Sequence, residues 1–209
     1  MEAAVLLLLA LLLGRGGEAW IESLYRSQMD VLRYPAAVKG HFFGRLLLLS
    51  GGFWGAGLVL SGLPLTLAEL AARLVLVWFL LLTICTDWEQ HVVFDRMIFP
   101  LALLVLPFFP LLGWPVWNHV FAALAGGGIF FLLAVLTKGG IGGGDIKLVF
   151  VLGLWLGTGK LFSVLVWGCL FSGAVAAVML LAGIWKRNEY YAYSPYFSLV
   201  AIGMLLFGS

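Results

Sequence analysis

Apolar runs of membrane-spanning length follow one another along almost the whole chain of 209 residues. Hydrophobic residues make up 63% of the sequence and charged residues only 11%, whereas a soluble domain carries about 25% charged residues. Too few charges remain to build a surface in water. The sequence therefore predicts an all-α fold, a polytopic bundle of membrane-spanning helices.

We expect about eight transmembrane helices, with a range of six to eight. A spanning helix needs about 20 mostly apolar residues, and the first, sixth and last runs are shorter than this. Counting the short ones, the expected spans are 3–13, 46–65, 67–86, 97–114, 116–137, 146–157, 161–185 and 195–207.

A polar stretch after the first span suggests that the chain divides into two parts. Residues 1–45 would hold the short first span and a cytoplasmic or interfacial segment, and residues 46–209 would form the membrane-embedded domain. Five apolar residues recur at helical spacing in the first part, which predicts a helix lying at the membrane interface. They are Ile21, Leu24, Tyr25, Met29 and Leu32.

Basic residues predict how the chain is oriented, because loops on the cytoplasmic side are enriched in Lys and Arg. If the first span runs inward, only Arg73 and Lys160 fall at the outer ends, and the other ten of the twelve basic residues face the cytoplasm. Those ten are Arg15, Arg26, Arg33, Lys39, Arg45, Arg96, Lys138, Lys147, Lys186 and Arg187.

Two junctions on this predicted cytoplasmic side place an acid at the end of an apolar run. Residues 86–96 read TDWEQHVVFDR, in which Asp87 ends a span, and residues 138–148 read KGGIGGGDIKL, in which Asp145 opens one. Asp is a preferred N-cap residue, so capping is a sufficient explanation for Asp145. Asp87 fits a structural role less well, since the helix dipole disfavours a negative charge at a carboxyl end.

The same acids can be interpreted as a catalytic pair. Two carboxyls held close together share a proton, and one can then activate water while the other polarises a peptide carbonyl. Asp87 and Asp95 are eight residues apart, or about 12 Å along one helix, which is too far. Asp145 is the remaining partner, and the glycines before it, including Gly142 and Gly144, would allow a close approach to another helix.

The second junction resembles the GxGD signature of the bacterial type IV prepilin peptidases. Residues 138–157 read KGGIGGGDIKLVFVLGLWLG, Asp87 and Asp95 match a helix-end Asp followed eight residues later by Asp or Asn, and residues 194–199 (SPYFSL) resemble a further family segment. The resemblance covers roughly residues 74–207. It implies a membrane aspartic endopeptidase that removes the basic leader of type IV prepilin or pseudopilin precursors at the cytoplasmic face of the bacterial inner membrane.

In that interpretation Asp87 and Asp145 are the catalytic dyad. Lys147 is either a residue that reaches the membrane interface or one that modulates the pair, and Glu89 and Asp95 are either loop charges or contacts for the basic leader. The supporting residues are therefore Gly142, Gly144, Lys147, Glu89 and Asp95.

The chain departs from the family in its first part. Full-length members carry a cytoplasmic module with two Cys pairs, which is associated with N-methylation of the product, but residues 15–45 contain no Cys. Val93-Phe94 also stands where the family often has Ile-Pro. We therefore expect cleavage without methylation. The alternatives from other classes are a proton-coupled transporter, which would use acids near the middle of its spans, and an inactive scaffold.

No cofactor, metal or nucleic acid is expected. His41, His91 and His119 are far apart and have no Cys or His at ligand spacing. A net charge of +2 without a basic cluster does not suit nucleic-acid binding. The expected partners are the lipid bilayer and the pilin-like precursor.

Overall fold

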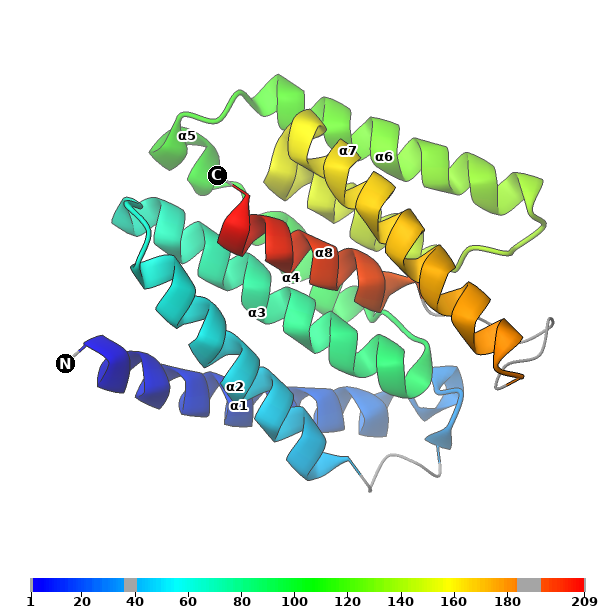
Figure 1. The fold of residues 1–209 in the computed structure, drawn as a ribbon, viewed down its shortest axis with the longest axis horizontal. Coiled ribbons are helices and arrows are strands. Elements are labelled where there is room, and N and C mark those ends of the chain that lie inside the picture. The colour runs from blue at the N-terminus through cyan, green and yellow to red at the C-terminus, as the bar shows by residue number, and fades with distance from the viewer. Residues whose placement is uncertain (1, 36–40, 184–192, 209) are drawn as a thin grey trace.

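The computed structural model describes residues 2–35, 41–183 and 193–208. Within these ranges every regular element is helical and no strand occurs, which confirms the predicted fold class (Figure 1). The helices are α1 (Glu2–Ser27), the 3-10 turn η1 (Met29–Val31), α2 (Phe42–Ser61), α3 (Leu67–Gln90), α4 (Asp95–Leu104), α5 (Phe108–Leu112), α6 (Val116–Leu136), α7 (Gly143–Leu181) and α8 (Ser194–Phe207).

Five of these helices are long and apolar enough to cross a membrane, namely α1, α2, α3, α6 and α7. The bounds of α2, α3 and α6 agree with three predicted spans to within four residues. α8 agrees with the predicted last span, but its 14 residues are fewer than a typical span requires. The chain is thus a polytopic helical membrane protein, while the number of eight spans stays a prediction.

The first span was predicted too short. The first helix does not end near Gly14 but continues to Ser27, so the residues expected to begin a separate interfacial helix belong to it instead, and the 3-10 turn η1 follows it. Ile21, Leu24 and Tyr25 are fully buried on this continuous helix, against the bundle. The interruption at Arg15 does not end the helix because this side chain is exposed and covers the ring of Phe42.

The predicted span 97–114 was also wrong, because two short helices replace it. α4 ends at Leu104, and the chain turns before α5 begins at Phe108. Pro107 lies in this turn. Proline has no amide hydrogen to donate and disfavours helical geometry in the residue before it, which accounts for the break.

α7 contains the predicted break between the spans 146–157 and 161–185. Gly157 has φ 70° and ψ −179°, which no helix contains, and Figure 1 shows the chain turning back at this point. A straight helix of 39 residues would be about 58 Å long, nearly twice the thickness of the hydrocarbon core. The bend is thus required for both halves to remain within one bilayer. The end of the second predicted span, at residue 185, lies outside the described residues, as do Lys39, Lys186 and Arg187.

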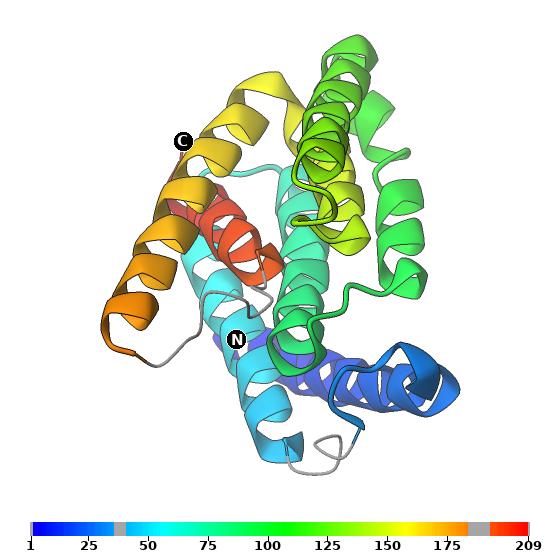
Figure 2. The same ribbon diagram turned by 90° about the vertical axis from the view of Figure 1, so that its right-hand side faces the viewer.

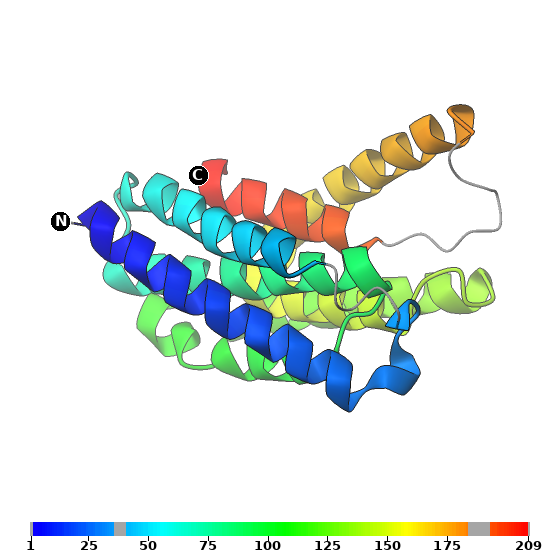
Figure 3. The same cartoon turned by 90° about the horizontal axis from the view of Figure 1, so that it is seen from below.

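The bundle has two distinct ends. Both chain termini lie at one end, together with the bend of α7, whereas the α3–α4 and α6–α7 connections lie at the other (Figures 1 and 3). α8 packs against both α3 and α7 and lies between them in the view of Figure 2. The end with the α3–α4 and α6–α7 connections holds both predicted catalytic acids.

Candidate active site

Asp87 lies in the last turn of α3 and is 4% exposed. The helix does not end at Asp87, as the sequence had suggested, but at Gln90. His91 caps it in a left-handed conformation, with φ 52°, and donates its amide hydrogen to the Asp87 carbonyl at 2.9 Å. One oxygen of the Asp87 carboxyl, Oδ2, is buried without a hydrogen-bond partner in the described part of the chain. A buried polar atom of this kind is available to a water molecule or a substrate.

Asp145 lies in the first turn of α7 and is 8% exposed. It is not the N-cap, so the capping explanation was wrong: Gly142 holds that position, and Asp145 is the third residue of the helix. Its carboxyl accepts a hydrogen bond from the Ser194 hydroxyl at the start of α8. The positive end of the α7 dipole also favours a negative charge here.

The two acids line one pocket of about 370 Å³. They reach it from different helices, 58 residues apart in the sequence (145 − 87), and the charge of Asp145 acts on the Asp87 carboxyl. The backbone amide of Ser194 faces both carboxyls. The structure therefore brings together the two residues that the sequence singled out.

The glycines before Asp145 permit this approach. A Cβ on Gly144 would lie 2.8 Å from the Cβ of Val93, in the loop that follows α3, whereas a Cβ on Gly143 would meet nothing within 4 Å. A Cβ on Gly142 would lie 3.3 Å from the Asp145 carboxyl. Gly144 thus allows the start of α7 to contact the loop that follows the Asp87 helix.

Lys147 and Asp95 meet at the rim of the same pocket. The Lys147 ammonium donates to the Asp95 carboxyl at 2.6 Å, and both side chains are mostly exposed, at 53% and 71%. Lys147 therefore lines the pocket, and whether it also modulates the pair of acids stays a prediction. An exposed ion pair of this kind contributes little to stability.

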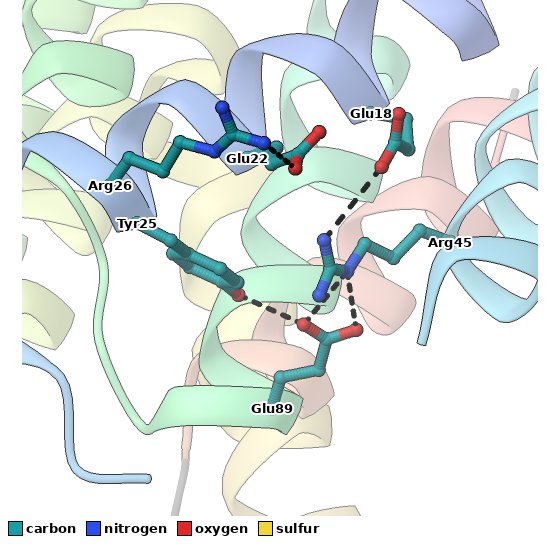
Figure 4. A network of polar contacts seen from close by, with 6 residues as sticks. All are labelled: Glu18, Glu22, Tyr25, Arg26, Arg45 and Glu89. Carbon is teal, nitrogen blue, oxygen red and sulfur yellow. Dashed lines mark hydrogen bonds and ion pairs between the residues drawn. The ribbon is translucent and has the colours of Figure 1, made fainter. Parts of the chain in front are cut away.

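Glu89 does not line the pocket. Its carboxylate accepts hydrogen bonds from Arg45 Nε, at 2.9 Å to both oxygens, and from the Tyr25 hydroxyl at 3.0 Å (Figure 4). Arg45 also lies 3.9 Å from Glu18. This buried cluster joins α1, α2 and α3 and holds Glu89 in a structural contact, away from the pocket lining.

Sequence reasoning missed several of these contacts. Ser194 was noted only as part of a family segment, although its place before Pro195 at the start of a helix is a signal that could have directed attention to it. Gln90 was also missed: its side-chain amide pairs with both the N–H and the carbonyl of Tyr34, at 2.9 and 3.1 Å. This pairing joins the end of α3 to the segment after α1, from which Gln28 and Val31 line the pocket.

Within the described ranges, no group of three or more His, Cys, Asp or Glu side chains could hold a metal ion. Cys85 lies on α3 and Cys169 on α7, and both are free thiols. His91 borders the pocket, where burial and the positive charge of Arg33 lower the pKa of its imidazole. The ionisable side chains that line the pocket are therefore Asp87, Asp145, Asp95, Lys147 and His91.

Fold and site together define a polytopic helical membrane protein with two buried acids in a pocket at one end of the bundle. A model of the type IV leader peptidase family matches residues 74–178, which is half of the chain and includes both acids. The chain belongs to this family, as its GxGD segment had indicated.

Similar curated proteins are bacterial and carry the name prepilin leader peptidase/N-methyltransferase. The protein of Neisseria gonorrhoeae is 30% identical over 184 residues, which cover 84% of this chain and 57% of the relative. That of Bacillus subtilis (strain 168) is 27% identical over 147 residues, covering 67% and 57%. That of Aeromonas salmonicida (strain A449) is 32% identical over 147 residues, covering 66% and 49%. The match thus spans about half the length of these relatives. No solved structure matches the chain.

Proposed function

We propose that this protein is a membrane aspartic endopeptidase that removes the leader peptide from type IV prepilin or pseudopilin precursors. The observation that carries the proposal is the convergence of two buried carboxyls, Asp87 and Asp145, on one pocket. The family supports the substrate, because its members are leader peptidases.

The chemistry is direct hydrolysis. One carboxylate takes a proton from a water molecule, whose oxygen attacks the scissile carbonyl carbon. The other carboxyl, still protonated, donates a hydrogen bond to the carbonyl oxygen. Collapse of the tetrahedral intermediate breaks the C–N bond and transfers a proton to the leaving amine. No covalent enzyme intermediate forms.

The surroundings of the two acids suggest which carboxyl has which role. Asp145 lies at the positive end of a helix dipole and accepts a hydrogen bond from the Ser194 hydroxyl, and both features favour a carboxylate. Asp87 lies at the negative end of α3, with one oxygen unpartnered. We therefore assign Asp145 as the carboxylate that takes the proton from water and Asp87 as the protonated carboxyl that donates to the carbonyl oxygen.

The proposed orientation places the pocket at the cytoplasmic face of the bacterial inner membrane. The ends of α1, α3 and α6 and the starts of α4 and α7 lie at the end of the bundle that holds the pocket (Figure 1). The basic residues that belong to these ends or directly follow them are Arg26, Arg33, Arg96, Lys138 and Lys147. Loops enriched in basic residues remain in the cytoplasm. A precursor would then present its leader to the pocket while its apolar stem stays in the bilayer.

The transporter alternative receives no support from the positions of the acids. Asp87 and Asp145 each lie within a turn of a helix end, on the same side of the bundle. An ion path would instead need acidic groups deeper in the spans.

A cleavage assay tests the proposal. Purified protein in detergent is incubated with a pilin-like precursor, and the product is weighed by mass spectrometry. Asp87→Asn and Asp145→Asn should each lower the rate by about 10²- to 10⁴-fold while the protein still elutes as a folded species. Asp95→Asn is the matched control, because its carboxyl is 71% exposed in the rim ion pair. Equal loss of activity in Asp95→Asn would show that the dyad is wrongly assigned.

A further inference from the structure

A second pocket lies at the opposite end of the bundle from the two acids. It has a volume of about 200 Å³ and is lined by the first turns of α3, the start of α6, both sides of the bend in α7 and the end of α8. Its polar and aromatic lining consists of Glu69, Arg73, Trp114, His119, Trp155 and Lys160. The proposed peptidase activity assigns no role to this pocket.

The pocket contains the two basic residues that do not fall on the predicted cytoplasmic side. Arg73 and Lys160 alone fall at the predicted outer ends of the spans, and the fold brings them together from α3 and α7. The charge of Arg73 acts on the Lys160 ammonium. Two like charges near one pocket repel each other, so an anion placed between them would be stabilised by both.

Among the described residues, no ion pair within 4.0 Å joins Arg73 or Lys160 to a carboxylate. The negative charge of Glu69 acts on both cations from a longer distance and offsets them only in part. Glu69 is the one acid of the lining, and its Oε2 is already bonded at 2.8 Å to both the amide and the hydroxyl of Thr66, in the cap of α3. Arg73 uses Nη1 to donate to the Leu205 carbonyl at 2.7 Å. The other N–H groups of its guanidinium remain available to a ligand.

The walls of the pocket are held by polar contacts. The Thr158 hydroxyl donates to Asn118 at 2.6 Å, directly beyond the bend at Gly157. His119 Nδ1 lies 2.8 Å from the Leu154 carbonyl, and its ring stacks on Trp114 with centroids 5.0 Å apart. A cavity fixed in this way binds a ligand at a lower entropic cost than one that must first be ordered.

We propose that this pocket binds an anionic phosphate group, as the headgroup of a phospholipid or inorganic phosphate would present it. The guanidinium fork of Arg73 matches phosphate geometry, and Lys160 adds a second positive charge. The volume is below the range of about 300–1,000 Å³ that drug-sized ligands occupy, which suits a headgroup. Tryptophan is enriched at the depth of the lipid headgroups, and Trp114 and Trp155 line this pocket.

Ligand titrations of the intact protein in uncharged detergent test this site, with thermal unfolding as the measurement. One titration uses short-chain phosphatidylglycerol and the other inorganic phosphate. Lys160→Gln should weaken binding about tenfold, since a hydrogen bond to a charged group is lost. Glu69→Gln should strengthen binding several-fold, because it removes the negative charge and yet keeps a Gln that can complete the capping box of α3.

Arg15→Gln is the matched control, because it removes an exposed positive charge from α1 and should leave the affinity unchanged. Binding of phosphatidylglycerol alone with these sensitivities identifies a lipid site, and equal binding of inorganic phosphate identifies a soluble anion; both support the proposal. The absence of binding by either ligand, or equal affinities in the wild type, Lys160→Gln and Glu69→Gln, would overturn it. None of these measurements depends on peptidase activity.

Discussion

Replacing Glu89 by Gln should destabilise the folded protein without removing a contact to the leader. The Glu89 carboxylate is bonded to Arg45 at 2.9 Å and to Tyr25 at 3.0 Å (Figure 4). The side chains of Arg45 and Glu89 are only 2% and 10% exposed. Breaking a buried pair by removing one partner costs about 3–5 kcal/mol when the other charge is left uncompensated. Gln keeps one acceptor oxygen and Glu18 remains 3.9 Å from Arg45, so we expect the lower end of this range, about 3 kcal/mol.

Thermal unfolding in detergent, without substrate, measures this loss. For a chain of about 150–250 residues, 1 kcal/mol corresponds to about 2–4 °C, so the midpoint of Glu89→Gln should fall by about 6–12 °C. Glu22→Gln is the matched control. Glu22 forms an ion pair with Arg26 on the same face of α1, at 2.5 Å, but those side chains are 43% and 76% exposed. That pair is worth less than about 1 kcal/mol.

A double-mutant cycle separates the pair from its surroundings. Arg45→Met alone should also be strongly destabilising, whereas Arg45→Met combined with Glu89→Met should cost less than the sum of the two single changes, by about 0.5–3 kcal/mol. The reasoning is refuted if Glu89→Gln unfolds within about 2 °C of the wild type and yet loses leader cleavage. That result would place Glu89 at the substrate.

The fold class could be predicted because apolar runs of this length leave few alternatives. The candidate site could be predicted in part, because Asp87 and Asp145 lie at the ends of apolar runs, where a buried charge is costly and needs a reason. That they line one pocket is a feature of the structure, whereas their catalytic roles remain proposals. The glycine run indicated a close approach, and Gly144 against Val93 is where that approach occurs.

The parts that could not be predicted depend on pairs of residues far apart in the sequence. Hydropathy treats Arg15 and Glu18 as the end of an apolar run, but α1 continues because Arg15 is exposed and Glu18 lies beside Arg45 of α2. The contact between Ser194 and Asp145 likewise joins residues 49 positions apart. No periodicity within a single segment reports such a contact.

The remaining predictions concern the loop beside Asp145, pH and methylation. Gly144→Ala should displace the start of α7, because its Cβ would lie 2.8 Å from a neighbouring side chain. It should lower the cleavage rate far more than Gly143→Ala, whose Cβ would meet nothing within 4 Å. Equal cleavage rates in the two variants would contradict this. The pKa of His91 is lowered from 6.5 by burial and a nearby arginine, so the folded state favours the neutral ring. The neutral His91 ring therefore stabilises the folded protein fully above its ordinary pKa, and this contribution is lost as the pH falls through the lowered pKa of the folded state. When the pH is lowered from 7 to 5, the thermal midpoint of His91→Asn should therefore fall by less than that of the wild type. Finally, we expect cleavage without methylation. The two thiols of the chain, Cys85 and Cys169, lie on separate spanning helices, so they cannot provide the two cysteine pairs of the family's methylating module. After incubation with a precursor and S-adenosylmethionine, the product should have the mass of the unmodified mature pilin. An added methyl group on its new amino terminus would mean that the donor binds among the helices themselves.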